Sequence, residues 1–333
     1  MVKKIKEYKD QKPYQVAPTP DVAHLPKVKG YNFEEEFDFQ KFINSYATTG
    51  FQATNLSRGI EICKEMQKND STIFLGYTSN MVTSGIRDII RFLVKNKLVH
   101  AIVTTGGGIE EDLIKVLKPF HIGVFNVSGR SLFEKGINRA GNVFIPNDRY
   151  LYFEKFINPF LDRLMKEQKK GIIHSSSDIT RELGKEISNE KNFDESILYW
   201  AYKNNIPVFC PAIMDGSFGD LVYFMKQRSP DFIIDVTKDS KVIIDLALNS
   251  EKSGAIILGA GVVKHFILNA NIFREGLNYA VYINTSEEYD GSDSGATAEE
   301  AMSWGKINTN ADYVKIHADA TIIFPLLVAG AFR

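Results

Sequence analysis

Short apolar runs and amphipathic stretches alternate along the chain from Tyr31 onward. The β-branched and aromatic run Ser71–Tyr77 has the length of a buried strand, and apolar residues recur at helical spacing over Gly85–Lys97. The same unit recurs down the chain, with further strands predicted at His100–Thr104, Ile206–Pro211, Phe232–Val236, Ala255–Leu258, Tyr279–Ile283 and Val314–His317 before a closing apolar helix. This alternation predicts an α/β fold with a doubly wound, mainly parallel sheet covered by helices on both faces.

The first 30 residues do not share this pattern. Five lysines, from Lys3 to Lys12, are followed by Pro13, Pro18, Pro20 and Pro26 before any sustained periodicity begins. Prolines at this density interrupt helices and strands. We therefore expect an N-terminal arm over residues 1–30 and a single domain over residues 31–333.

Composition narrows the class of protein. With 333 residues that are 44% hydrophobic, the chain is long enough for a large buried core. A formal net charge of −1 gives no overall field for nucleic acid or an anionic membrane. The two cysteines, Cys63 and Cys210, form no metal-ligand motif and fit a reducing compartment. Without an apolar signal segment or a membrane-length apolar run, we expect a cytoplasmic protein without a metal site.

Three loops that follow predicted strands consist largely of small residues. They are Thr78–Gly85, Thr104–Gly108 and Gly259–Gly261. Ligands of doubly wound sheets bind at such strand ends, where small residues let backbone N–H groups approach a diphosphate beside a helix N-terminus. Neither of the first two loops has the G-x-G-x-x-G spacing, and each of the three alone is typical of a tight turn. Together they favour a nucleotide site in a Rossmann-like fold.

Asp319 lies just beyond the predicted strand Val314–His317. A carboxylate at this place can accept hydrogen bonds from both hydroxyls of a ribose. Aspartate is also a common N-cap, and taken alone Asp319 is better explained as the cap of a helix from Ala320 onward.

Carboxylates gather in the same loops. Glu110 and Glu111 follow the triple glycine, and Asp215 and Asp220 flank Gly216–Gly219. One later loop and helix start carries Glu287, Glu288, Asp290, Asp293, Glu299 and Glu300. Individually such residues are typical of solvated surface or of a first helical turn. Together they favour a pocket for a small polycation such as a polyamine, with Trp304 offering an aromatic face to an ammonium group.

Lys306 lies between Trp304 and Ile307 instead of in a charged run. Most lysines are solvated, but partial desolvation here would lower the pKa of this amine and let it form or exchange an imine. His265, beyond the glycine turn at Gly259–Gly261, is a candidate proton-transfer partner, although a lone histidine is more often structural.

Eight segments of the sequence match one family pattern. They cover residues 48–55, 76–85, 103–115, 136–139, 183–187, 206–220, 257–265 and 282–306. The last segment is the longest, and with Ile307 it reads YINTSEEYDGSDSGATAEEAMSWGKI. On these segments the chain resembles the deoxyhypusine synthase family over essentially its full length.

The resemblance implies an NAD-dependent aminobutyl transferase. In this family NAD takes a hydride from spermidine, and the aminobutyl part is held as an imine on an enzyme lysine. The group then passes to a lysine of the precursor of translation initiation factor 5A, which is the first step of hypusine formation. Lys306 matches the covalent lysine, and His265 matches the histidine near the reacting amine. No metal is required, because the cofactor carries the hydride chemistry.

The resemblance also implies two sets of binding residues. The NAD set is Ser79, Asn80, Met81, Val82, Thr83, Thr105, Gly106, Gly107, Glu111, Asp215, Ala260, Thr285, Ser286, Asp319 and Ala320. The spermidine set is Glu110, Glu111, Asp220, His265, Gly291, Ser292, Asp293, Glu300, Trp304 and Lys306.

Assembly and two alternative functions follow from the same resemblance. The family is a homotetramer, a dimer of dimers, with active sites between paired subunits, and residues 1–30 match in placement an arm that covers a neighbouring site. A homospermidine synthase would use the same chemistry with putrescine as acceptor. A non-catalytic regulatory paralogue is the second alternative, and the presence of Lys306, Trp304 and His265 argues against it. The segment Gly171–Thr180 has no predicted chemistry, and Ser177 or Asp178 is expected to cap the next helix.

Overall fold

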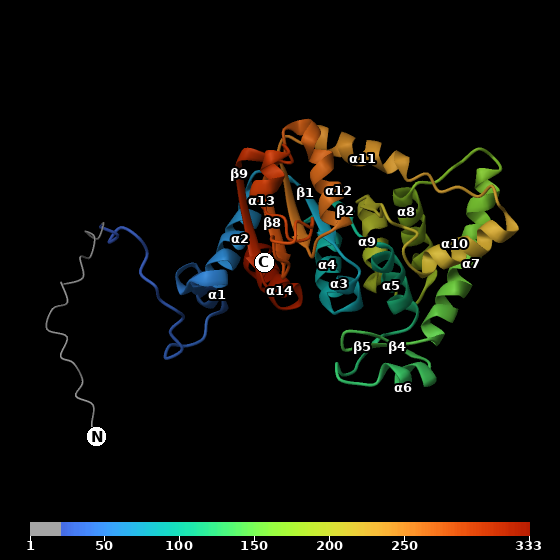
Figure 1. Ribbon diagram of the computed structural model, residues 1–333, viewed down its shortest axis with the longest axis horizontal. Coiled ribbons are helices and arrows are strands. Elements are labelled where there is room, and N and C mark those ends of the chain that lie inside the picture. Colours follow the sequence, from blue (N-terminus) through green and yellow to red (C-terminus); the bar gives the residue numbers. More distant parts are fainter. Residues whose placement is uncertain (1–20) are drawn as a thin grey trace, which may run out of the picture.

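The computed structural model describes residues 21–333 (Figure 1). The strands of its main sheet are β1 (Thr72–Tyr77), β2 (Ala101–Val103), β6 (Val208–Phe209), β7 (Ser253–Leu258), β8 (Leu277–Asn284) and β9 (Ile307–His317). They are all parallel and lie in the order β6-β2-β1-β7-β8-β9. Along the chain, β2 and β6 are added on one side of β1, and β7, β8 and β9 are added on the other side. The predicted doubly wound parallel sheet is therefore confirmed.

Helices cover both faces of this sheet (Figure 1). They are α1 (Phe39–Thr49), α2 (Phe51–Lys68), α3 (Asn80–Thr83), α4 (Ile86–Lys95), α5 (Gly106–Leu117), α6 (Gly129–Glu134), α7 (Asp148–Gln168), α8 (Ser176–Glu186), α9 (Ile197–Asn204), α10 (Ser217–Arg228), α11 (Thr237–Leu248), α12 (Val262–Asn271), α13 (Ala298–Ser303) and α14 (Ala320–Ala331). Among the closest neighbours of the sheet, α2 and α14 contact β8 while α12 contacts β1, β2 and β7.

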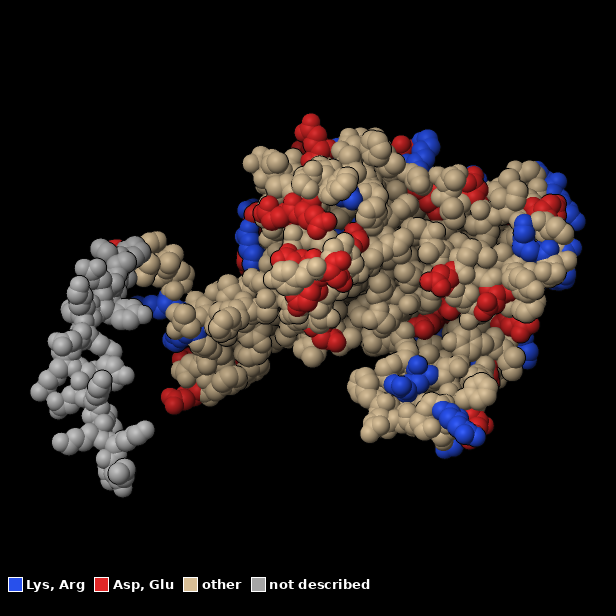
Figure 2. Space-filling view, in the orientation of Figure 1, with Lys and Arg blue, Asp and Glu red and all other residues tan. Residues whose placement is uncertain are grey.

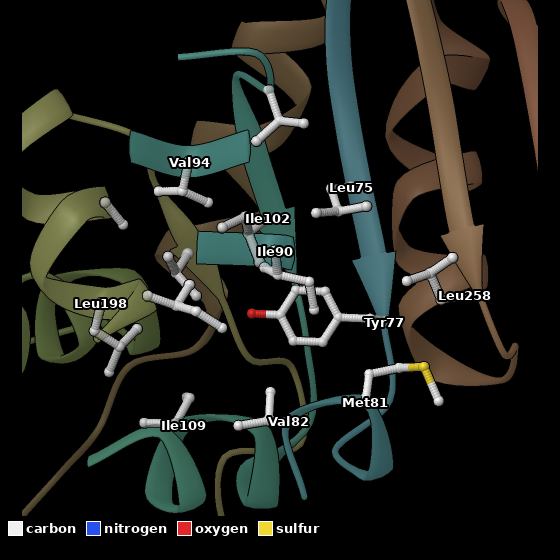
Figure 3. Packing of buried hydrophobic residues seen from close by; sticks show 14 of the residues in the cluster. Leu75, Tyr77, Met81, Val82, Ile90, Val94, Ile102, Ile109, Leu198 and Leu258 are labelled. Atoms are coloured by element: carbon white, nitrogen blue, oxygen red, sulfur yellow. The ribbon is translucent and has the colours of Figure 1, made fainter. Parts of the chain in front are cut away.

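Strand alternation divides the core into two clusters, one on each face of the sheet. In β1, Leu75 and Tyr77 belong to the larger cluster, whereas Phe74 belongs to the smaller one beneath α11 and α12. Figure 3 shows Tyr77 among Ile90, Val82 and other apolar side chains of the larger cluster. Because successive side chains of a strand point to opposite faces, a run buried at nearly every position is typical of a central parallel strand.

Two local predictions were wrong, and one small sheet was not predicted. Residues Phe232–Val236 form no strand, because Lys226 and Gln168 satisfy backbone groups of this segment in place of a neighbouring strand. The triple glycine is not a loop, since α5 begins at Gly106. Residues 119–146 form a small antiparallel sheet that the sequence did not reveal, made of β3 (His121–Ile122), β4 (Ile137–Ala140) and β5 (Val143–Pro146).

The cap of α8 is a capping box. Ser175 is the N-cap residue, its hydroxyl accepts from the N–H of Asp178, and the Asp178 carboxylate accepts from the N–H of Ser175. The prediction of a cap in this segment was therefore right for Asp178 and wrong for Ser177. The Ser177 hydroxyl instead donates to the buried Asp239 at 2.6 Å.

The predicted arm lies partly outside the described residues, because the structure describes the chain only from residue 21. Residues 21–30 are exposed and contain no helix or strand. Beyond them, Tyr31 packs edge-on against Phe33, Phe37 and Phe42, which ties the following segment to α1.

Candidate active site

The segments after β1 and β2 hold eight of the fifteen predicted cofactor residues. Ser79 precedes α3, and Asn80, Met81, Val82 and Thr83 form it; Thr105 caps α5, which opens with Gly106 and Gly107. The two loops touch, because the N–H of Ser79 donates to the hydroxyl of Thr105 at 3.1 Å. The side chains of Met81 and Val82 are buried in the core. Their predicted cofactor contacts are therefore restricted to backbone atoms.

Gly106 allows a close approach between backbone segments. A Cβ atom at this residue would lie 2.3 Å from the carbonyl oxygen of Asp215, in the loop after β6. Any larger residue would push these two loops apart. The position therefore requires glycine if the carboxyl ends of β2 and β6 are to stay in contact.

Five further predicted cofactor residues follow β7, β8 and β9. Ala260 lies between two glycines with positive φ, Gly259 and Gly261, at the start of α12. Thr285 and Ser286 follow β8 directly. Asp319 is the N-cap of α14, which begins at Ala320, and its Oδ1 accepts from the N–H of Thr321 at 2.7 Å. The capping role is thus confirmed, and it leaves the carboxylate at the carboxyl edge of the sheet, where Ala260 and Ser286 also lie.

Buried carboxylates lie on α5, beside these loops. Glu110 accepts from the N–H of Phe218 at 2.9 Å, and burial raises its pKa, with Asp220 and Asp215 adding to the rise. Glu111 accepts from the hydroxyl of Thr83, and burial raises the pKa of Glu111 to about 7. This part of the molecule thus holds acidic groups whose charged form is disfavoured, as often occurs at functional sites.

A separate cavity contains the predicted covalent lysine. Its volume is about 400 Å³, and α12, α13 and the loop between β8 and α13 form its walls. The predicted residues that line it are His265, Gly291, Asp293, Glu300, Trp304 and Lys306. Figure 2 shows acidic side chains gathered on the face formed by this part of the chain.

Lys306 and His265 face each other in this cavity. The Nζ of Lys306 lies 3.2 Å from Nε2 of His265, and the amide of Asn269 lies 2.9 Å from the other ring nitrogen, Nδ1. If the amide nitrogen of Asn269 donates to Nδ1, a neutral His265 carries its proton on Nε2, next to the lysine amine. The pair can then pass a proton between imidazole and amine.

The turn before Lys306 also presents Trp304. Gly305 has a φ of +68°, which lets the chain turn directly from α13 into β9. The Trp304 ring is 67% exposed, and the Nζ of Lys306 lies 5.6 Å from its centre. Ile307, the other predicted apolar neighbour, is buried in the core. Of the two predicted apolar neighbours, Trp304 therefore lies beside Lys306 at the cavity, and Ile307 belongs to the core.

The structure divides the predicted spermidine residues into two groups. Glu110, Glu111 and Asp220 lie on α5 and α10 and do not line the cavity of Lys306. Those helices follow β2 and β6, at the opposite end of the sheet from β9 (Figure 1). Ser292 lies in the same loop as Gly291 and Asp293. One chain therefore brings together only part of the predicted set.

Sequence reasoning missed three residues that shape these regions. Lys264 lines the cavity although it is almost completely buried, Asn269 contacts His265, and Lys115 donates from α5 to the carbonyls of Val82, Thr83 and Ser84. The available signal was Lys264 within the apolar helical run Val262–Leu268, where a solvated lysine is not expected.

Two general properties concern residues 21–333. No helix in this range is long and apolar enough to cross a membrane. Across the same range, no three histidine, cysteine or acidic side chains are grouped as a metal site requires.

A doubly wound sheet with polar loops along its carboxyl edge and an amine–imidazole pair in a cavity places the chain among the α/β enzymes. Comparison with known proteins gives the family. The deoxyhypusine synthase family model matches residues 41–331. The chain is 48% identical to the deoxyhypusine synthase of Arabidopsis thaliana, over 92% of this chain and 90% of the relative. It is 46% identical to that of Caenorhabditis elegans, over 92% and 89%.

A solved structure agrees with these relatives. The crystal structure of a candidate deoxyhypusine synthase from Entamoeba histolytica matches with a TM-score of 0.68 at 30% identity, covering 92% of this chain and 96% of that one. The chain therefore belongs to the deoxyhypusine synthase family. Since deoxyhypusine synthases are transferases, it belongs to a family of enzymes of that class.

Proposed function

We propose that the chain is an NAD-dependent deoxyhypusine synthase, which moves the aminobutyl group of spermidine to a lysine of the translation initiation factor 5A precursor. The observation that carries this proposal is the contact of 3.2 Å between Lys306 Nζ and His265 Nε2 inside a cavity lined by carboxylates. Family membership supports the choice of substrates.

The cavity suits a polyamine. Asp293 and Glu300 supply negative charge, and Trp304 offers an aromatic face that attracts ammonium groups. Oδ2 of Asp293 is buried and accepts no hydrogen bond from any residue between 21 and 333. A buried acceptor without a donor is costly, so an ammonium group of the substrate at this atom would relieve that cost.

Lys306 acts as the nucleophile in this proposal. Its neutral amine adds to the carbon of the C=N bond formed on the oxidised spermidine, and 1,3-diaminopropane leaves as the aminobutyl group stays on Lys306 as an imine. The incoming lysine of the acceptor protein repeats the exchange and frees Lys306. His265 carries the proton between the amines in both exchanges.

The segments at the carboxyl ends of the sheet strands fit a dinucleotide. Gly106 and Gly107 open α5, and Cβ atoms at these two glycines would collide with Asp215 and Ser79, so backbone N–H groups lie close to the space a diphosphate would use. Ser79, Thr105, Ser286 and Asp319 would hold the cofactor. When bound, NAD would supply the hydride acceptor and later the hydride donor of the reaction.

The divided spermidine residues favour a site shared by two copies of the chain. Glu110, Glu111 and Asp220 are separated from the cavity of Lys306 within one chain. A two-fold axis would bring the α5 and α10 region of one copy to the cavity of the other and complete two equal sites at once. A dimer of such pairs, the homotetramer, is the assembly that we propose.

Isotope transfer tests the function. The purified chain is incubated with NAD and with spermidine labelled in its butylamine portion, in the presence of either the factor 5A precursor or putrescine. Label is expected in the precursor protein for the wild type and is expected to be absent with Lys306→Ala.

The other outcomes separate the alternatives. Label only in homospermidine would assign the chain to the putrescine-using relatives. Transfer to neither acceptor, in a protein that still binds NAD, would favour a regulatory subunit. Transfer that persists in Lys306→Ala would contradict the role of this lysine.

A further inference from the structure

The loop between β8 and α13, residues 285–297, serves both ligands in the proposed function. Thr285 and Ser286 at its start belong to the predicted cofactor set, and Gly291, Ser292 and Asp293 in its middle belong to the predicted spermidine set. The loop contains no helix or strand. Few of its own backbone bonds hold it, among them those from Gly295 and Ala296 to the carbonyl of Ser292. Something else must fix its conformation.

Lys264 holds the middle and end of this loop. It extends from α12, and its side chain is 1% exposed. Its Nζ donates to the carbonyl oxygens of Asp293 at 2.6 Å and Ala296 at 2.7 Å, and lies 5.2 Å from the centre of the Tyr282 ring. Two short bonds to carbonyls and an aromatic face satisfy an ammonium group that cannot reach water.

Lys315 holds the start and end of the same loop from the opposite element. It lies on β9, and its Nζ donates to the carbonyl oxygens of Ser286 at 2.7 Å and Gly295 at 3.1 Å. Together the two lysines bind four carbonyls of the loop. Gly295 and Ala296 are consecutive residues, and each is held by one of the two lysines. Ser286 belongs to the predicted cofactor set and Asp293 to the predicted spermidine set.

Packing does not explain the burial of Lys264. Placing an ammonium group in the interior is costly, and an apolar residue of similar size is usually tolerated better at such a site. Burial lowers the pKa of Lys264, and the nearby charge of Asp293 opposes this shift. A buried lysine at this position is therefore best explained by the loop carbonyls that only a donor can satisfy.

We infer that Lys264 and Lys315 are positioning residues that clamp the loop 285–297, with Lys264 setting the polyamine end and Lys315 setting the dinucleotide end. The inference rests on the proposed function for the identity of the two ligands. Lys264 acts through Asp293, which lines the cavity, and Lys315 acts through Ser286.

Hydrogen exchange of the ligand-free protein tests the clamp directly. Lys264→Met is expected to raise exchange of the amides in residues 290–297, and Lys315→Met is expected to raise it in residues 285–288. Lys226→Met is the matched control, because Lys226 also donates to two loop carbonyls, those of Pro230 and Phe232, away from the cavity. It should leave residues 285–297 unchanged.

Binding and kinetics then test the division of roles. Lys264→Met should raise the KM for spermidine about tenfold or more, the effect of one lost charge-assisted hydrogen bond, and change the Kd for NAD less than about twofold. Lys315→Met should show the reverse. Lys264→Arg, which keeps the charge and donors, should recover part of the spermidine affinity. Lys264→Gln, which keeps an N–H donor group without the charge, replaces Lys264→Met if that variant does not fold.

The results separate the clamp from the function. Unchanged exchange in residues 285–297, or equal losses of both affinities in both variants, would overturn the inference. A wild-type chain that binds NAD but neither binds nor transfers from spermidine would overturn the proposed function, while the exchange data would still decide whether the two lysines hold the loop.

Discussion

The two halves of the proposed site are built in different ways. The dinucleotide half uses the loops after β1 and β2, where Gly106 approaches another backbone segment and Lys115 holds three carbonyls of the neighbouring loop. The polyamine half is an open cavity, with Trp304 largely exposed and Lys306 placed before β9, at the amino end of that strand. The first half is therefore determined by the sheet itself, and the second by one long loop and the turn at Gly305.

This difference separates binding from chemistry. Strand ends in a doubly wound sheet provide backbone donors at fixed positions, which suits a cofactor that stays bound. A cavity formed by a loop and a short helix can exchange amines and admit a macromolecular acceptor. Substitutions should therefore affect one half of the site without the other.

Replacing the nucleophile should give the largest effect. Lys306→Arg keeps a positive charge but removes the amine that forms an imine, because a guanidinium stays protonated. We expect transfer to fall at least about a thousandfold, as when a covalent nucleophile is lost, with the Kd for NAD unchanged. Single-turnover label transfer and calorimetric titration of NAD measure the two quantities. A parallel loss of NAD affinity would show that the halves are not independent.

The next largest effect concerns stability on the dinucleotide side. Asp112 on α5 is fully buried; it accepts from Arg87 at 2.7 Å, from the hydroxyl of Ser196 at 2.7 Å, and from the N–H groups of Ile197 and Leu198. It thereby joins α5 to α4 and caps α9. Asp112→Ala leaves the Arg87 charge buried, and we expect a loss of about 3–5 kcal/mol in the free energy of unfolding.

Urea unfolding measures this loss. The exposed pair of Arg130 and Glu134 gives the matched control, because Glu134→Ala should cost at most about 1 kcal/mol. A small effect of Asp112→Ala would mean that α5 is held mainly by apolar packing.

The same contrast explains what the sequence could predict. The strands β1, β7 and β8 are buried apolar runs, so their positions and their parallel direction followed from periodicity and from the helices between them, whereas the order of the strands came from the structure. The dinucleotide loops followed in turn, because their positions are set by the strand ends. Lys306 was predicted from its apolar neighbours and His265 from its place after a glycine turn, both supported by the resemblance, and their contact was a result of the structure.

Other features depend on tertiary contacts that no local pattern records. The small sheet of β3, β4 and β5 consists of strands of two to four residues, too short for periodicity to reveal. Phe232–Val236 is apolar but finds partners in side chains instead of a strand. Lys264 meets the carbonyls of Asp293 and Ala296 about 30 residues later in the chain, a pairing that only the folded loop creates.

A smaller effect is expected at the close approach of Gly106. The added Cβ of Gly106→Ala would lie 2.3 Å from the carbonyl oxygen of Asp215, so the loops after β2 and β6 must move apart. Overpacking of this kind costs about 1–3 kcal/mol, and we expect roughly tenfold weaker NAD binding with the spermidine KM little changed. Gly129→Ala is the control, because a Cβ at Gly129 meets no atom within 4 Å. Equal NAD affinity in both variants would contradict a dinucleotide at these loops.

The last prediction is a pH dependence of stability on the dinucleotide side. Burial raises the pKa of Glu111 from 4.5 to about 7. Between these values the folded protein keeps a proton that the unfolded chain releases, so the stabilisation is present below pH 4.5 and is lost as the pH rises to about 7. Glu111→Gln removes this dependence. Relative to the wild type, the variant should therefore gain roughly 3 kcal/mol in the free energy of unfolding between pH 4.5 and pH 8.

Urea unfolding at pH 4.5, 6 and 8 measures this gain, with Glu154→Gln on the exposed surface of α7 as the control. If NAD binds only the charged form of Glu111, saturating NAD stabilises the wild type in that form. The stability gain of Glu111→Gln over the wild type should then vanish. A variant whose stability relative to the wild type stays constant with pH would show that Glu111 is ionised in the folded protein. In that case the dinucleotide half would carry the negative charge of Glu111 throughout this pH range.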